Sequence, residues 1–440
     1  MPYLVYSFLL GLLILLTLPF WAWRYFTTLK YKGTVLQRFG WDLPTFFSQN
    51  DKPRIWLHAV SVGETLAAKG VVEQLLNRFP DHEIVLSTVT KTGQQVALEK
   101  LSGVGAVFYL PIDLPWIVNR VINQVRPRFF VVMETELWPN LFHAMQKRDI
   151  PVMTINGRLS PNSFKNYYRF RFFMRTFLEP VRLFAMQSTM DAQRMAQIGG
   201  LRDIIHHTGN LKYDQALQLP TPFDMELLAH KIPVPEDPVW IAASTHPTEE
   251  EKVLGVYDRL RIEIPTLRLI LVPRHPDRAD EVCELVQKGG WRCARISEVE
   301  RPFPGQRKGQ GQWHEPVLVV DQVGWLGRLY GYAQVAFVGG SLVPHGGQNM
   351  LEPAAWSIPA IFGPHTFNFK EASQQMLDAD GGVMVEDEET LYQETLFLFQ
   401  SPDKRQEMGA RAHKVVADNA GALKRTMDAI EGTIEGYPLT

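Results

Sequence analysis

The chain has 440 residues, of which 45% are hydrophobic and 21% charged, so its composition is globular and its length exceeds what one hydrophobic core usually supports. A net charge of -2 at pH 7 excludes the strongly basic character of a nucleic-acid-binding protein. Cys283 and Cys293 are the only cysteines, and we interpret them as reduced residues rather than as a disulfide framework or a metal site.

The N-terminus departs from this globular pattern. Residues 2–23 contain no charged side chain, and an apolar run of this length suffices to cross a hydrocarbon core, which needs about 20 residues. A signal peptide would need a basic n-region and a small-residue cleavage site, and neither is present. Trp21 and Trp23 end the run as interface anchors, and Arg24 opens a basic stretch. We therefore predict an uncleaved transmembrane or membrane-anchor helix at 2–23, with the rest of the chain in the cytoplasm.

Between residues 54 and 160, short apolar strands alternate with helical patterns. The clearest strands are Ile55 to Val60, Ile84 to Thr90 and Phe129 to Thr135. Such alternation predicts a parallel sheet covered on both faces, with ligand-facing residues at the carboxyl ends of the strands. The polar residues that fall at these ends are His58, Ser61, Glu64, Thr88, Asp113, Glu134, Glu136, Asn156 and Arg158.

A second series of strands and helices begins at residue 239, after a proline-rich segment at 217–238 that we predict to be an interdomain linker. The expected organisation is an N-terminal Rossmann-like domain at 24–216 and a C-terminal one at 239–440. Two such α/β domains facing a cleft, with a phosphate loop in the second, form the layout of GT-B glycosyltransferases. The last helical stretch, 404–431, is a candidate to return to the first domain.

The phosphate loop is the segment FVGGSLVPHGGQNMLEP at 337–353. An apolar strand leads into Gly339 and Gly340, and after a short loop a helix is expected to open at Asn349. Backbone N–H groups converging there would suit a phosphate, and the Glu352 carboxylate would accept hydrogen bonds from sugar hydroxyls. The alternative is a tight strand-to-helix turn without a ligand.

Two neighbouring strand ends in the same half add polar groups. Ser244, Thr245 and His246 close one strand, and Pro273, Arg274 and His275 close the next, which together make a candidate phosphate cradle. Zinc is the rival explanation for the histidines, but their spacing does not match a metal motif.

Four residues are candidates for the chemistry. Glu64, at a strand end and helix start, is the candidate general base, with an ordinary helix N-terminal acid as the alternative. Glu134 and Glu136 are two carboxylates in an apolar context, which are costly unless something cationic or hydrogen-bonding meets them. Lys212 would stabilise developing negative charge if it faces the site, and is otherwise a surface lysine.

The segment from Ser163 to Phe184 interleaves basic residues with eight aromatic residues. A helix of this composition suits a membrane interface, with rings at the acyl boundary and cations on anionic head groups. The alternative is an amphipathic helix whose aromatic residues belong to the core. Because an anchor is predicted at 2–23, we favour the membrane interpretation.

These segments occur in an order that resembles the Kdo transferases, which move 3-deoxy-D-manno-octulosonic acid (Kdo) from a CMP donor to a lipid A precursor. The motifs are LHAVSVGE, VMETELWPN, NGRLS, TGNLKYD, AASTHPTEEE, LVPRHPDR and FVGGSLVPHGGQNMLEP, running from Arg54 to Pro353. The resemblance implies a GT-B fold, an inverting transfer with no metal or other cofactor, CMP-Kdo as donor, and a lipid acceptor reached from the membrane.

The resemblance also implies roles for individual residues. Glu64 matches the proton acceptor, and Glu134 and Lys212 match positions assigned to transition-state support. Pro273 and Arg274 match a CMP-binding pair, and Asn349, Met350, Leu351 and Glu352 match a second CMP-binding segment. Val323, Gly324 and Trp325 stand at a further position by the nucleotide. Ser244, Thr245, Gly340 and Ser341 are expected to bind the donor because they lie at the strand end and in the phosphate loop described above. The chain departs from the family pattern in two places: Gln348 replaces a histidine, and Trp325 replaces a glutamate. Trp325 would stack on cytosine instead.

Two other functions fit parts of the pattern. One is a different GT-B enzyme, such as a UDP-sugar lipid glycosyltransferase or a sugar-nucleotide epimerase, which would prefer UDP to CMP. The other is a non-catalytic membrane-anchored lipid-binding protein that kept the fold. The presence of Glu64, Glu134, Lys212 and Glu352 favours an enzyme.

Overall fold

The fold was analysed in a computed structural model. It describes residues 1–27, 33–44, 47, 52–199, 201–218, 221, 225–226, 228–229, 232, 235–299, 313 and 315–436. Ten of the 22 residues of the predicted linker at 217–238 lie outside the described residues.

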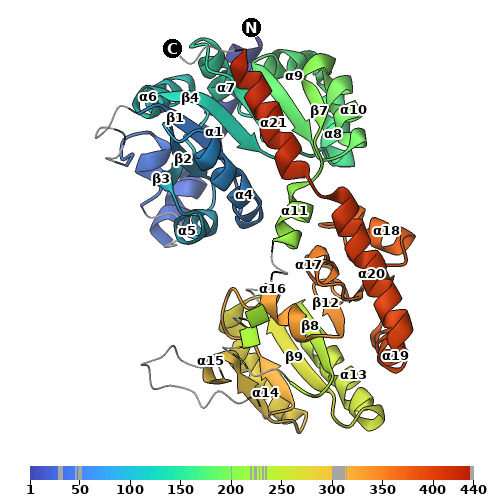
Figure 1. The fold of residues 1–440 in the computed structure, drawn as a ribbon. Coiled ribbons are helices and arrows are strands. Elements are labelled where there is room, and N and C mark those ends of the chain that lie inside the picture. Colours follow the sequence, from blue (N-terminus) through green and yellow to red (C-terminus); the bar gives the residue numbers. More distant parts are fainter. Residues whose placement is uncertain are drawn as a thin grey trace. The chain divides into compact units, whose positions relative to one another are not determined.

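The chain forms two compact units, each built around its own parallel sheet (Figure 1). Unit 1 comprises residues 1–211 and 420–440, and unit 2 comprises residues 212–419. The prediction of two Rossmann-like α/β halves is confirmed.

The sheet of unit 1 has the strand order β3-β2-β1-β4-β5-β6-β7, with all neighbouring strands parallel. Its central strands are buried along their whole length because helices cover both faces. The strands are β1 (Arg54–His58), β2 (Glu83–Thr88), β3 (Val104–Tyr109), β4 (Pro127–Met133), β5 (Val152–Gly157), β6 (Val181–Met186) and β7 (Ile205–His207).

The sheet of unit 2 has the order β10-β11-β9-β8-β12-β13-β14 and is also parallel. Its strands are β8 (Val239–Thr245), β9 (Arg268–Pro273), β10 (Cys293–Arg295), β11 (Val317–Val319), β12 (Val335–Val338), β13 (Ala360–Phe362) and β14 (Gly382–Met384). The sequence order reverses at β8, between β9 and β12, and ligands of open α/β sheets bind at such a reversal.

Helices pack on both sheets. Those of unit 1 are α1 (Pro2–Thr27), α2 (Val35–Arg38), α4 (Val62–Arg78), α5 (Lys91–Lys100), α6 (Pro115–Val125), α7 (Pro139–Gln146), α8 (Pro161–Arg169), α9 (Arg171–Leu178), α10 (Thr189–Ile198) and α21 (Ala422–Glu435). Those of unit 2 are α13 (Glu249–Glu263), α14 (Ala279–Lys288), α15 (Ile296–Val299), α16 (Leu326–Leu329), α17 (Leu351–Ala355), α18 (Lys370–Asp378), α19 (Glu388–Gln400) and α20 (Pro402–Asn419). The helix α11 (Leu211–Leu217) begins at the boundary of the units.

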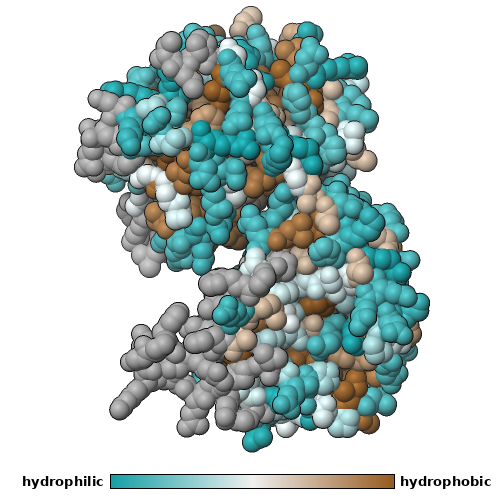
Figure 2. Space-filling view, viewed as in Figure 1, coloured by the Kyte–Doolittle hydropathy of each residue, from teal (hydrophilic) through white to brown (hydrophobic). Residues whose placement is uncertain are grey.

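The C-terminal helical stretch breaks at Gly421, whose φ of 85° cannot continue a helix. Before the break, α20 packs on unit 2, and its exposed side is mainly hydrophilic (Figure 2). After the break, α21 buries Met427 and Ile430 in the core of unit 1. Arg425 Nε donates to the Thr208 carbonyl at 2.8 Å, and Arg78 pairs with Glu431 at 2.7 Å. The chain therefore ends on the unit in which it began.

The aromatic segment from Ser163 to Phe184 is not a single helix. It contains α8 and α9, with a break at Phe170, and its last residues enter the buried strand β6. The prediction of one interfacial helix is wrong in this respect, because Val181, Leu183 and Phe184 are buried in a strand that pairs with β5. Phe170, between α8 and α9, and Phe172 and Phe173, at the start of α9, are nevertheless exposed.

Candidate active site

Glu64 lies where β1 gives way to α4, at the carboxyl edge of the first sheet. The Ser61 hydroxyl caps α4 and accepts the Glu64 N–H at 3.5 Å. The Glu64 carboxylate accepts the Val60 N–H at Oε2 (2.8 Å) and the Ser61 hydroxyl at Oε1 (2.9 Å). This arrangement is close to a capping box, so the helix start itself fixes the position of the carboxylate.

The environment of Glu64 changes its acidity. Burial raises its pKa from 4.5 to about 7, and the negative charges of Glu134 and Glu136 add to this rise. The bonds from Val60 and Ser61 oppose the rise without cancelling it. A carboxyl group with this pKa exchanges protons readily near neutral pH, which is the property of a general base.

Glu134 and Glu136 lie beside Glu64, directly after β4. Glu134 has a φ of 57°, a left-handed conformation that costs a non-glycine residue about 1 kcal/mol or more, and its N–H donates to the Ile155 carbonyl at 2.8 Å. Burial raises the pKa of Glu136, and the charge of Glu134 raises it further. The structure thus brings together three carboxylates that the sequence spreads over 73 positions.

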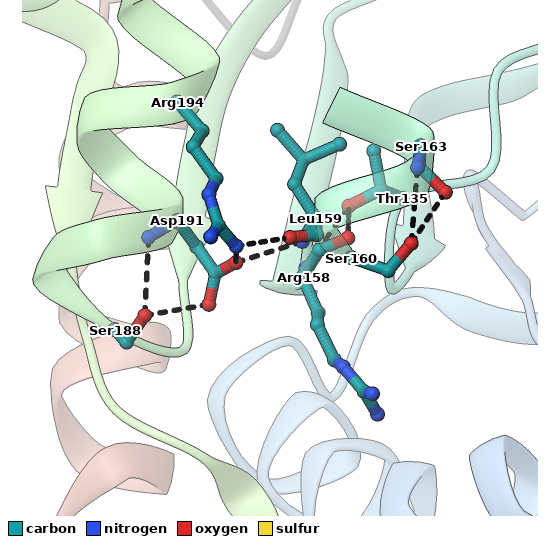
Figure 3. A network of polar contacts seen from close by, with 8 residues as sticks. All are labelled: Thr135, Arg158, Leu159, Ser160, Ser163, Ser188, Asp191 and Arg194. Carbon is teal, nitrogen blue, oxygen red and sulfur yellow. Dashed lines mark hydrogen bonds and ion pairs between the residues drawn. The ribbon is translucent and has the colours of Figure 1, made fainter. Parts of the chain in front are cut away.

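The loop after β5 is held on both sides by a polar network (Figure 3). Thr135 Oγ1 donates to the Arg158 carbonyl at 2.6 Å and accepts the Arg158 N–H at 2.9 Å. On the other side, Asp191 Oδ1 accepts the Leu159 N–H at 2.8 Å, and Arg194 donates to the Leu159 carbonyl at 2.7 Å. The exposed side chain of Arg158 extends away from this network in Figure 3, so its backbone is fixed while its guanidinium faces solvent.

Asn156 positions the segment that contains Lys212. It has a φ of 53°, and its Oδ1 accepts the Leu211 N–H at 3.1 Å. Lys212 follows in α11, and its Nζ lies 4.9 Å from the centre of the Phe369 ring in unit 2. Phe369 follows Asn368, whose N–H donates to the Gly346 carbonyl at 2.9 Å, so Lys212 lies near the glycine-rich loop of unit 2.

Two polar residues expected to face a ligand are instead structural. His58 is fully buried, its Nδ1 contacts Ser87, and burial lowers its pKa to about 4. Asp113 is buried and caps α7 by accepting the N–H groups of Asn140 and Leu141 at 3.1 and 2.8 Å. Both residues lie at or shortly after the end of a strand, as predicted, but their side chains are buried in the protein.

Arg274, Asn349 and Glu352 come together in unit 2, at the carboxyl edge of the sheet. Asn349 Nδ2 donates to Glu352 Oε1 at 3.1 Å. Burial raises the pKa of Glu352, while the bond from Asn349 and the positive charge of Arg274 lower it. The α17 helix begins at Leu351 rather than at Asn349, and the side chains of Met350 and Leu351 are buried in the core. Their side chains are therefore not exposed to a ligand, and the Leu351 N–H already donates to Asn349 Oδ1 at 3.2 Å.

The two-glycine turn holds a carboxylate of the protein itself. Glu249 is fully buried, and its Oε2 accepts the N–H groups of His246 (3.0 Å) and Gly340 (2.7 Å). Its Oε1 accepts those of Ser341 and Leu342, both at 3.0 Å. Because Glu249 already accepts the Gly340 and Ser341 N–H groups, these two amides are not open to a phosphate, and the donor-binding role expected of the two residues stays a prediction. The run Glu249 to Glu251 was visible in the sequence, but nothing in it indicated which glutamate turns inward.

Three imidazoles gather next to this turn. The His246 ring stacks on that of His345 at 4.2 Å between centroids, and His275 approaches at 6.3 Å. Gln348 Nε2 lies 3.3 Å from His246 Nε2, so the residue that replaces a histidine of the family pattern keeps a polar contact here. Burial and the surrounding positive charges lower the pKa of His246 to about 4. Among the described residues, no group of three or more His, Cys, Asp or Glu side chains is arranged to hold a metal ion.

The second departure from the family pattern lies before α16. Gly324 has a φ of 96°, Val323 is 75% exposed, and the Trp325 indole N–H donates to Gln322 Oε1 at 3.0 Å. The Trp325 ring packs partly against the core of unit 2. Stacking of this ring on a cytosine stays a prediction.

Comparison with known proteins gives consistent results. A family model described as 3-deoxy-D-manno-octulosonic-acid transferase (kdotransferase) matches residues 34–215. The 3-deoxy-D-manno-octulosonic acid transferase of Haemophilus influenzae is 35% identical over 412 residues, which are 92% of this chain and 92% of that protein. The transferase of the same name from Bordetella pertussis is 33% identical over 388 residues, 86% of each chain.

Solved structures share the architecture. The UDP-GlcNAc 2-epimerase from Neisseria meningitidis matches with a TM-score of 0.58 at 12% identity, covering 86% of this chain and 100% of that one. A glycosyltransferase from Rickettsia africae matches with a TM-score of 0.53 at 16% identity, covering 89% and 100%. At this level of identity, the likeness shows the GT-B fold alone.

Proposed function

Because this chain belongs to the 3-deoxy-D-manno-octulosonic acid (Kdo) transferase family, we propose that it is an inverting glycosyltransferase that moves Kdo from CMP-Kdo to a lipid A precursor, lipid IVA, in lipopolysaccharide biosynthesis. The observation that carries the proposal is the Glu64 carboxylate, fixed at a helix start with a pKa of about 7. Family membership supplies the class of reaction, and Glu64 supplies a base suited to it.

In the proposed reaction, Glu64 takes the proton from an acceptor sugar hydroxyl. The hydroxyl oxygen then forms a bond to the anomeric carbon of Kdo, on the side opposite the phosphate. The bond from that carbon to the phosphate oxygen breaks, and its electrons leave with CMP. Inversion follows because attack and departure occur on opposite faces.

Unit 2 is proposed to bind the donor. The exposed guanidinium of Arg274 would meet the CMP phosphate, where negative charge develops as the bond breaks. Asn349 and Glu352 offer an amide and a carboxylate for the hydroxyl groups of the nucleoside. Glu249 is proposed to shape the turn that positions these groups rather than to bind the donor itself. Glu134 and Lys212 are proposed to support the transition state.

The membrane is proposed to be the source of the acceptor, with the catalytic units on the cytoplasmic face. Residues Pro2–Trp21 of α1 have a mean hydropathy of 2.2 and none of that window is buried within the protein. Phe172 is 80% exposed at the start of α9, and Arg169, Arg171 and Arg175 are its neighbours along α8 and α9. Apolar rings beside cations suit a membrane surface with anionic head groups.

The test is release of CMP by the purified protein, with CMP-Kdo regenerated in situ, in the presence and absence of tetraacylated lipid A precursor. The proposal expects acceptor-dependent CMP release and a matching gain in the mass of the lipid. Folded protein that binds CMP without acceptor-dependent release would contradict the proposed acceptor. A preference for UDP over CMP would contradict the proposed donor.

A further inference from the structure

We propose that α1 does not cross the bilayer but lies along unit 1 within a single leaflet, so that both of its ends stay on the side of the membrane that carries the catalytic units. This inference rests on the proposed function in one respect only, namely that α1 contacts the membrane.

The first turns of α1 are bound to the folded part of unit 1. Tyr3 Oη donates to the Thr176 carbonyl at 2.8 Å, at the end of α9. The Tyr3 ring stacks on His143 of α7, with centroids 4.0 Å apart and planes within 15°. Ser7 Oγ lies 3.0 Å from Asn140 Oδ1, also in α7. Three polar or aromatic contacts thus join the N-terminal end of α1 to two helices that cover the sheet.

A fourth contact ties the same end of α1 to a buried carboxylate. The Tyr6 hydroxyl bonds Asp113, the residue that caps α7 through the N–H groups of Asn140 and Leu141. Burial raises the pKa of Asp113 to about 6, and these bonds oppose the rise. Tyr6 of α1 is therefore a hydrogen-bond partner of Asp113, a buried residue that caps α7 in unit 1. Such a network cannot be placed on the far side of a membrane from its own domain.

The C-terminal end of α1 is also tethered to unit 1. Helix α2 follows soon after it, and the Gln37 side chain accepts the Tyr109 N–H of β3 at 3.3 Å. The Arg38 carbonyl accepts the Ile112 N–H at 3.0 Å. The link from Thr27 to Thr34 reaches at most about 25 Å. Both ends of α1 are consequently held near one compact unit.

Chain geometry then decides between a span and an in-plane helix. From Tyr3 to Thr27, a helix extends about 36 Å at a rise of 1.5 Å per residue. If α1 crossed a hydrocarbon core about 30 Å thick, Tyr3 would lie on the opposite surface from the domain that follows Thr27. The contacts of Tyr3 and Ser7 with α7 and α9 would then be impossible.

The two faces of α1 differ as an in-plane helix requires. One face of α1 is half-buried and includes Tyr3 and Ser7, which contact unit 1. Its positions recur at helical spacing: 3, 7, 10, 14 and 17. The opposite positions are strongly exposed, with Leu4 at 75%, Phe8 at 70% and Leu16 at 70%. The acyl chains of one leaflet are the partner that covers this apolar face. The exposed rings of Phe170, Phe172 and Phe173 extend the apolar face of α1, because α9 itself contacts α1.

The test is site-specific labelling in sealed membrane vesicles of both orientations, with a membrane-impermeant maleimide. The full chain carries Cys283→Ala and Cys293→Ser, and one new cysteine at a time: Pro2→Cys at the start of α1, or Leu98→Cys as the marker for unit 1. Leu98 is 68% exposed on α5, so its cysteine reports the side of the catalytic units.

The inference expects the Pro2→Cys protein to be labelled in the same vesicle orientation as the Leu98→Cys protein, or only after detergent dissolves the leaflet. Labelling of the Pro2→Cys protein in the opposite orientation would overturn the inference and leave the proposed transferase intact. Recovery of the unmodified protein in the soluble fraction would overturn both the membrane contact and the inference, whereas failure of the transferase assay alone would overturn only the proposed reaction.

Discussion

Replacing Glu64 by glutamine removes the proposed base with little change of shape. The carboxamide oxygen can still accept the Val60 N–H, which the carboxylate accepts at 2.8 Å, so α4 should start where it does now. Turnover should fall by roughly two to four orders of magnitude, the usual contribution of a general base. In the wild-type protein, kcat/KM should fall tenfold per pH unit below about 7, because the base must be deprotonated and its pKa is about 7.

The same substitution should change how stability depends on pH. The pKa of Glu64 is 4.5 when unfolded and about 7 when folded, so the folded state binds the extra proton between these values. The contribution of Glu64 to the stability of the folded state is therefore fully present below pH 4.5 and is lost as the pH rises through 7. The loss amounts to ~3 kcal/mol, since a pKa change of one corresponds to 1.36 kcal/mol. The Glu64→Gln variant should lack this loss.

The assay is urea unfolding of both proteins at pH 5 and pH 8, alongside steady-state kinetics across the same range. The control is Glu73→Gln, which changes a half-exposed glutamate on the same helix and should leave turnover and the pH dependence unchanged. Near-normal turnover of Glu64→Gln with intact CMP binding would refute the assignment of the base. An equal loss of stability between pH 5 and pH 8 in both proteins would refute the account of the raised pKa.

Three further outcomes are expected. Glu134→Gln should move the acid limb of the kcat/KM profile to lower pH, because it removes a negative charge that raises the pKa of Glu64; an unmoved limb would contradict this. Glu249→Gln should lower the free energy of unfolding of unit 2 by about 3 kcal/mol, because the NH2 group of the glutamine would face backbone N–H donors instead of accepting from them. Chemical denaturation should show this loss. The control variant Glu251→Gln, which changes an exposed residue of the same helix, should show none. Arg274→Ala should weaken CMP binding ~30-fold by calorimetry through loss of a charge-assisted contact of about 2 kcal/mol, and unchanged affinity would exclude it from the phosphate site.

Much of the fold could be predicted from local patterns. Continuous apolar runs followed by helical periodicity indicated the parallel strands, and the second series, predicted to begin at residue 239, does begin there with β8. The strands β6 and β7 were missed for a physical reason. Val181 lies at the end of a basic, aromatic segment whose helical pattern overrides its short strand, and β7 has only three residues, two of them histidines.

The candidate site could also be predicted only in part. The sequence by itself determined which residues stand at strand ends, because the carboxyl ends of parallel strands meet at one edge whatever the details of packing. Glu64, Glu134, Arg274 and Glu352 were identified on that basis together with the family resemblance. The roles given to them in the reaction stay predictions.

Only the tertiary structure determined which groups contact each side chain at the strand ends. Glu249 and Glu64 are both acids near helix starts, yet one is sealed among four backbone N–H groups while the other lies beside two carboxylates that raise its pKa. Likewise, the hydropathy of α1 allows a membrane span, but the contacts of Tyr3 and Ser7 hold it against unit 1. Burial and charge at a residue depend on neighbours that are distant in the chain, and local sequence does not encode their distances.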